Sequence, residues 1–132
     1  MIICKEVKFD CAHMLSYYTG KCSNLHGHTY HGIIRLEGIT GEDCMLVDYN
    51  KIKEHVDELD HAVIFSSAEF RNEAEEELLA LVQKHGMRHV VLPSGKSTAE
   101  TISQYLAEGL SQYGKATVRL SETDGSWAEA YV

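Results

Sequence analysis

The sequence lacks the features that mark several classes of protein. Its 132 residues include one proline, with no internal repeat and no proline- or glycine-rich linker, so we expect a single domain over residues 1–132. No apolar run approaches the ~20 residues of a membrane-spanning helix, and no secretion signal is recognisable at the start. We therefore expect a cytoplasmic protein with no membrane partner.

Positive charge is also scarce. The 12 lysines and arginines are outnumbered by 20 aspartates and glutamates, which gives a formal net charge of −8. This balance argues against a surface that binds nucleic acid or an anionic membrane. One local cationic pocket could still bind a phosphorylated small molecule. The four cysteines form no CxxC pair of the kind that structural zinc sites use.

Histidine, by contrast, is concentrated near the start of the chain. His13, His26, His28 and the thiol of Cys22 fall within 16 residues. In an extended segment His26 and His28 point to the same face and could bind one zinc ion at ~2.0–2.1 Å. If His13 from a neighbouring strand were the third ligand, one of the four tetrahedral coordination positions of the zinc ion would stay open, as in catalytic sites. Cys22 could be a fourth ligand, or a nucleophile or base beside an open metal.

Hydrophobic periodicity predicts an α+β fold. The expected order is ββ-α(α)α-ββ, which indicates a four-stranded antiparallel sheet with helices on one face. The expected strands span residues 2–13, 26–40, 116–123 and 126–132, and the expected helices span 49–59, 72–84 and 98–113, with a short extended piece at 89–92. The three histidines continue the apolar faces of the first two strands, whereas His31 has the opposite parity and should face solvent.

Other polar residues occupy positions that need an explanation. Glu122 ends an apolar strand face, where an unpaired charge is costly, so something must bind it. The adjacent Asp60 and His61 follow a helix and could simply be a solvated helix end. Residues 97–100 have the pattern of a capping box, and the acidic run at 75–77 suits a solvated first helical turn.

Five ordered blocks connect these observations. They are Phe9–His13, Cys22–Tyr30, Leu59–His61, Ser97–Glu100 and Ser121–Thr123. On these blocks the chain resembles the 6-pyruvoyl-tetrahydropterin synthase / 6-carboxytetrahydropterin synthase family, which has the tunnelling fold (T-fold). The resemblance spans nearly the whole chain, and it implies a Zn²⁺ enzyme that acts on a pterin triphosphate.

The resemblance implies a role for individual side chains. The residues that match the family's zinc ligands are His13, His26 and His28. Cys22 matches the catalytic thiol, which could act as a thiolate base beside a metal and an imidazole. Asp60 and His61 match the acid–base pair, and Glu122 matches the carboxylate that anchors the pterin.

The block that opens the last helix has two interpretations. Thr98 and Glu100 could contact substrate or a neighbouring subunit, as the resemblance implies, or they could only cap the helix. The resemblance also implies a homohexamer made of two trimers, with Cys22 meeting Asp60 and His61 across a subunit boundary. The helix at 72–84 lies in a segment longer than that of compact relatives, so we expect it at the periphery.

The spacing between Cys22 and His26 bears on the reaction. Only three residues separate them, as in 6-carboxytetrahydropterin synthases, whereas pyruvoyl-forming relatives have a longer spacer. We expect conversion of 7,8-dihydroneopterin triphosphate to 6-carboxytetrahydropterin, acetaldehyde and triphosphate, a step of queuosine or deazapurine synthesis. The related alternative is triphosphate elimination without carbon–carbon cleavage. Two other classes stay open: a zinc module closed by Cys22, and a zinc hydrolase.

Overall fold

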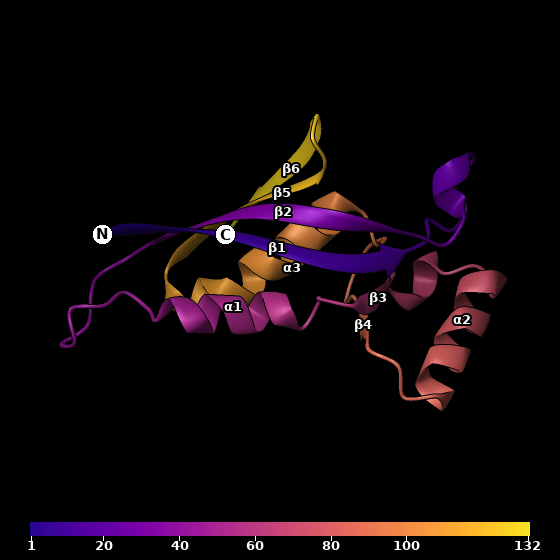
Figure 1. The fold of residues 1–132 in the computed structure, drawn as a ribbon, viewed down its shortest axis with the longest axis horizontal. Coiled ribbons are helices and arrows are strands. Elements are labelled where there is room, and N and C mark those ends of the chain that lie inside the picture. Colours follow the sequence, from indigo (N-terminus) through magenta and orange to yellow (C-terminus); the bar gives the residue numbers. More distant parts are fainter.

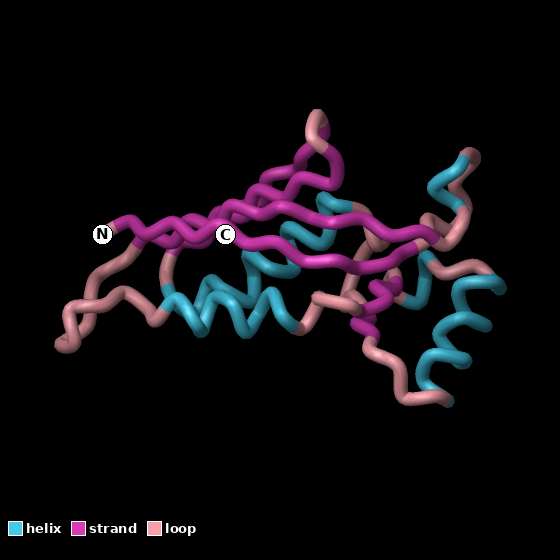
Figure 2. The backbone as a smooth tube through the Cα atoms, viewed as in Figure 1, coloured by secondary structure: helices cyan, strands magenta, loops and turns pink.

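A six-stranded mixed sheet forms the centre of the fold. The computed structural model describes residues 1–132, and the strands follow the order β4-β3-β1-β2-β5-β6 across the sheet (Figures 1 and 2). The strands are β1 (Ile2–His13), β2 (His26–Glu37), β3 (Ala62–Phe65), β4 (His89–Val91), β5 (Lys115–Thr123) and β6 (Ser126–Tyr131). The helices are α1 (Tyr49–Asp57), α2 (Glu73–Lys84) and α3 (Ala99–Leu110), with short 3₁₀ turns η1 (Lys21–Ser23), η2 (Ala68–Phe70) and η3 (Ser111–Tyr113).

The long hairpin of β1 and β2 is the element that positions everything else. The two strands pair antiparallel from Ile2 opposite Glu37 to His13 opposite His26. Alternation gives the hairpin one apolar face. The buried residues on that face are Phe9, Cys11, His13, Tyr30, Ile34 and Leu36. The predicted C-terminal hairpin is confirmed, with β5 and β6 paired antiparallel and β5 added to the edge of β2.

The prediction of a four-stranded, purely antiparallel sheet is wrong. β3 pairs parallel to β1, with Cys11 opposite Ala62, and β4 pairs parallel to β3. β3 is only four apolar residues long and shows no alternation, so periodicity could not separate it from the end of a helix. The extended piece at 89–92 was expected, but its partner was not. That partner is β3, and α2 lies in the connection between the two strands.

The helices occupy two places relative to this sheet. α1 and α3 cover its apolar face, with α3 under β5 and β6 and α1 under β1, whereas α2 lies at the far end beside β3 and β4 (Figure 1). α2 packs there in a small cluster of Phe65, Leu79 and Val82, separate from the main core. The expected peripheral position of this helix is confirmed. None of the helices is long and apolar enough to cross a bilayer.

The helix starts differ in part from expectation. Asp48 caps α1, and Asn72 caps α2 by accepting the Glu75 N–H at 2.9 Å. α3 is capped by Thr98, so Glu100 falls at the second helical position and the predicted capping box does not form. The expectation that the acidic run at 75–77 lies in a solvated first turn is wrong for Glu75, which is fully buried.

Candidate zinc centre and active site

The β1–β2 register gathers the three predicted histidines on one buried face. His13 lies opposite His26, and His28 lies opposite Cys11. The Nε2 atoms of His13 and His26 are 3.1 Å apart. With a carboxylate oxygen of Glu122, the histidines form a group whose candidate ligand atoms all lie within 4.8 Å of one another. His31 faces the other way and is exposed, as expected.

Backbone carbonyls fix the tautomers of two of these rings. His13 Nδ1–H donates to the carbonyl of Ser97 at 2.5 Å, and His26 Nδ1–H donates to that of Asn24 at 2.7 Å. Because a carbonyl can only accept, a neutral ring in each case carries its proton on Nδ1 and leaves Nε2 as a lone pair. A backbone carbonyl that accepts the other ring N–H is a usual partner of a metal-binding histidine.

A divalent cation fits between these nitrogens. Two facing lone pairs 3.1 Å apart repel each other, whereas two nitrogens bound to one tetrahedral zinc ion lie ~3.3 Å apart. His28 Nε2 is buried too, and its one close polar neighbour is the Glu122 carboxylate, with which it makes no aligned hydrogen bond. Burial lowers the pKa of His13 and of His28, which favours the neutral form that a metal ligand needs.

Glu122 lies against the histidines rather than alone on its strand. One of its oxygens is 2.8 Å from His28 Nε2 and 3.4 Å from His13 Nε2. An irregularity between Ser121 and Thr123 interrupts the pairing of β5 with β6 at this residue. The carboxylate could therefore complete a metal site.

Cys22 lies outside the group of converging ligand atoms. It sits in η1, half-buried, and its carbonyl accepts the Leu15 N–H at 2.9 Å, which returns the loop to the end of β1. Its sulfur is not among the atoms that approach one another at the histidines. This arrangement gives no support to a metal site closed by sulfur.

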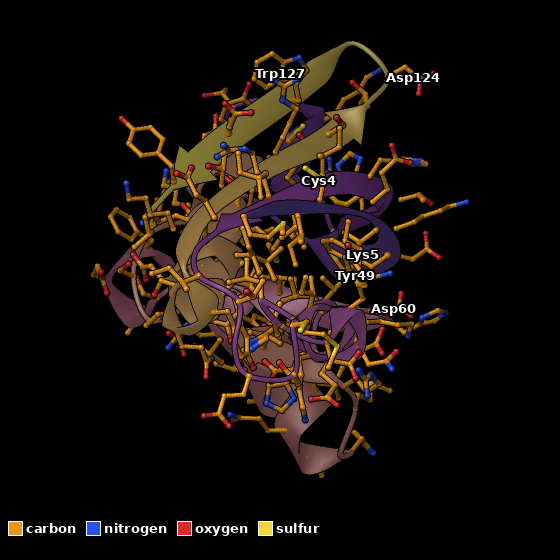
Figure 3. All side chains as sticks on the ribbon, turned by 90° about the vertical axis from the view of Figure 1, so that its left-hand side faces the viewer. Cys4, Lys5, Tyr49, Asp60, Asp124 and Trp127 are labelled. Carbon is orange, nitrogen blue, oxygen red and sulfur yellow. The ribbon has the colours of Figure 1, made fainter.

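Asp60 and His61 form a second group on another part of the surface. Asp60 Oδ2 lies 3.0 Å from His61 Nδ1, and its Oδ1 accepts the Asp10 N–H at 2.9 Å. That backbone N–H, with the His61 ring, lowers the pKa of Asp60. His61 is 72% exposed in its side chain, and Figure 3 shows Asp60 at the margin of the molecule.

The structure keeps this pair apart from the histidines within one chain. Asp60 and His61 converge with the carboxylate of Asp10, which has the opposite parity to Cys11 and His13 on β1. An open pocket of about 420 Å³ lies beside them, lined by His61, by His28 and by other residues of β1, β2 and β3. The chain thus holds two separate groups of possible ligand atoms, one of three histidines and Glu122 and one of Asp10, Asp60 and His61.

The block at the start of α3 contacts the site through its backbone. Thr98 accepts the Thr101 N–H as a helix cap, and Glu100 is exposed in a groove between α3 and β6. Ser97, assigned from the sequence only to capping, supplies the carbonyl that holds His13. The contacts of Ser97 and Asn24 with the histidines were not predicted, because a contact through a backbone carbonyl leaves no signature in side-chain type.

Cys11 is expected to be unreactive although it lies next to the site. It is 5% exposed, and burial, followed by the charge of Asp10, raises the pKa of its thiol to about 12. At pH 8 roughly one molecule in 10⁴ would carry the thiolate, against about a quarter for an ordinary thiol. Peptide mass spectrometry after brief iodoacetamide treatment should show alkylated Cys4 and Cys44 and unmodified Cys11, with Cys11 labelled only after denaturation.

Comparison with known proteins places these residues in a family. The family profile described as "6-pyruvoyl tetrahydropterin synthase" matches residues 2–131. The chain is 34% identical to the 6-carboxy-5,6,7,8-tetrahydropterin synthase of Haemophilus influenzae, over 96% of both chains. It is 33% identical to a putative enzyme of the same name from Pyrococcus abyssi, over 85% of this chain and 74% of that one.

Solved structures give the same fold at lower identity. The 6-pyruvoyl tetrahydropterin synthase of Plasmodium falciparum superposes with a TM-score of 0.62 at 22% identity, over 100% of this chain and 97% of that one. An uncharacterised protein of Wolinella succinogenes gives 0.68 at 22% identity, over 99% and 97%. The expected T-fold is thus confirmed in its α+β architecture, and the chain belongs to the 6-pyruvoyl tetrahydropterin synthase family.

Proposed function

We propose that this protein is a zinc-dependent 6-carboxytetrahydropterin synthase. The observation that carries the proposal is the group of three histidine Nε2 atoms, two with tautomers set by backbone carbonyls, with Cys22 close in sequence but outside the group. The two relatives compared above by sequence bear that name, one of them as putative, and they support the carboxy-forming branch of the family. The three-residue spacer between Cys22 and His26 points the same way.

The zinc ion would be held by the three histidines of the group. When bound it acts as a Lewis acid that polarises oxygens of the substrate's side chain. Cys22, as a thiolate, would take a proton from the same side chain. His61, oriented by Asp60 at 3.0 Å, would move protons on the opposite side, and Glu122 would hold the pterin edge by accepting hydrogen bonds.

The separation of Asp60 and His61 from the histidine group supports an active site shared between subunits. β4 and β6 end the sheet on either side, and open edges of this kind are commonly paired in an assembly. We infer a homohexamer of two trimers, in which Cys22 and the histidines of one subunit meet Asp60 and His61 of the next. Substrate would then be enclosed by residues that one chain holds apart.

The reaction is tested by its smallest product. With 7,8-dihydroneopterin triphosphate and water as reactants, the proposed route gives 6-carboxytetrahydropterin, acetaldehyde and triphosphate, and serves queuosine or another deazapurine. Trapping with a hydrazine reagent and mass spectrometry should detect one acetaldehyde per substrate consumed. Accumulation of 6-pyruvoyltetrahydropterin without the aldehyde would assign the protein to the other branch. No turnover, with sulfur bonded to the zinc, would instead support a closed zinc module.

A further inference from the structure

A buried glutamate on α2 has no part in the proposed chemistry. Glu75 has 0% of its surface exposed, whereas its neighbours Ala74 and Glu76 are exposed. Glutamate is almost never fully buried without polar partners. Both of its partners here are neutral: the Ser16 hydroxyl donates at 2.5 Å and the Ser66 backbone N–H donates at 2.9 Å.

Hydrogen bonds continue from this glutamate to the histidine group. Ser66 lies directly after β3, and its Oγ accepts the Ser97 N–H at 3.0 Å. The Ser97 carbonyl in turn accepts Nδ1–H of His13 at 2.5 Å. Ser66 and Ser97 are 0% exposed, so water cannot readily replace either contact. An unbroken path of buried contacts therefore joins Glu75 to a candidate zinc ligand.

Glu75 also holds the chain on the other side of His13. Ser16 lies three residues after that histidine. Its hydroxyl donates a hydrogen bond to Glu75 and accepts one from the Asn72 N–H at 3.1 Å. One carboxylate thus joins the segment that leaves β1 to the segment that leaves β3. Because Ser97 lies in a turn rather than in a helix or strand, its position depends on such contacts.

We propose that Glu75 is a positioning residue for the zinc centre. It acts through Ser66 and Ser97 to hold the imidazole of His13. The proposal rests on the zinc site of the proposed function. It also gives α2 a role: this peripheral helix carries the carboxylate that orders the turn before α3. The partner of Nδ1 sets both the tautomer and the ring orientation of a metal-binding histidine. A displaced Ser97 carbonyl would therefore weaken zinc binding by His13.

The test compares metal binding in Glu75→Gln with that of the purified wild-type protein. Glutamine keeps the size of the side chain but replaces one of the two accepting oxygens by an NH₂ group, so it cannot accept at both positions, where Ser16 and Ser66 donate to different oxygens. We expect zinc affinity, measured against a competing chelator, to fall roughly tenfold, the lower end of the effect of outer-shell partners. The d–d absorption of the Co²⁺-loaded protein should also change. Glu77→Gln, exposed on the same helix, should match the wild type in both measurements.

Ser66→Ala provides an independent variant. It removes only the oxygen that accepts the Ser97 N–H. It should shift zinc affinity and the Co²⁺ spectrum in the same direction as Glu75→Gln. If Glu75→Gln does not fold, the result for Ser66→Ala tests the positioning role. Wild-type affinity and spectrum in the folded variants, with or without a lower melting temperature, would overturn the positioning role. Failure of the wild-type protein itself to bind zinc would instead overturn the proposed function.

Discussion

Replacing His13 by alanine should abolish stoichiometric zinc binding. The ring lies on the buried face at the end of β1 and is 1% exposed, with Nδ1–H donated to Ser97 and Nε2 close to His26 and Glu122. Loss of this nitrogen leaves two histidines, and we expect zinc affinity to fall by more than the ~100-fold upper bound for outer-shell changes. Metal analysis after dialysis against a weak chelator measures the loss directly.

His31→Ala is the matched control for this experiment. His31 lies on β2 with the opposite parity to His28 and is exposed, so its removal should leave zinc content at the wild-type level. Circular dichroism should verify that the His13 variant remains folded, because a buried ring is also removed. A folded His13→Ala protein that retains full zinc content would contradict the assignment of the site.

Cys22→Ala should keep the zinc and lose most of the turnover. The sulfur lies outside the group of converging ligand atoms, so metal content should not change. A general base typically contributes ~10²–10⁴-fold to rate, and we expect a loss of that size in kcat for the dihydroneopterin substrate. Wild-type turnover in this variant would point to hydrolysis by a zinc-activated water, and a large loss of zinc would indicate that sulfur is a ligand.

Mixing two inactive variants tests whether the site is shared between subunits. His61→Ala should also be inactive, because the ring that faces Asp60 at 3.0 Å is gone. If Cys22 of one subunit works with His61 of another, hexamers reassembled from both variants should recover part of the wild-type rate. Mixtures that stay inactive after verified subunit exchange would place both residues in one subunit's site.

The parity of the first two strands could be predicted from the sequence. His13, His26 and His28 continue apolar faces, and the observed register gathers them on one buried surface as expected. The C-terminal hairpin and the three helices were also predictable within a few residues, because each carries a local signal of period, cap or turn. These features depend on neighbours along the chain.

The strand β3 was not predicted, and β4 was predicted only as an extended piece without a partner. Both strands are too short to show a period, and their parallel pairing joins segments that a crossover brings together. The burial of Glu75 was missed for a related reason. In the sequence it belongs to an acidic run typical of a solvated first turn, and only Ser16 and Ser66 explain its position.

The sequence by itself determined which side chains could bind metal and which face each would occupy, because strand alternation is a local property of the backbone. Only the tertiary structure decided how those side chains are held. The carbonyls of Ser97 and Asn24 set the tautomers of His13 and His26, and the Asp10 N–H holds Asp60 beside His61 in a group separate from the histidines. The Ser97 and Asp10 contacts join groups distant in sequence, and all three use backbone atoms that every residue except proline has, so residue type alone does not encode them.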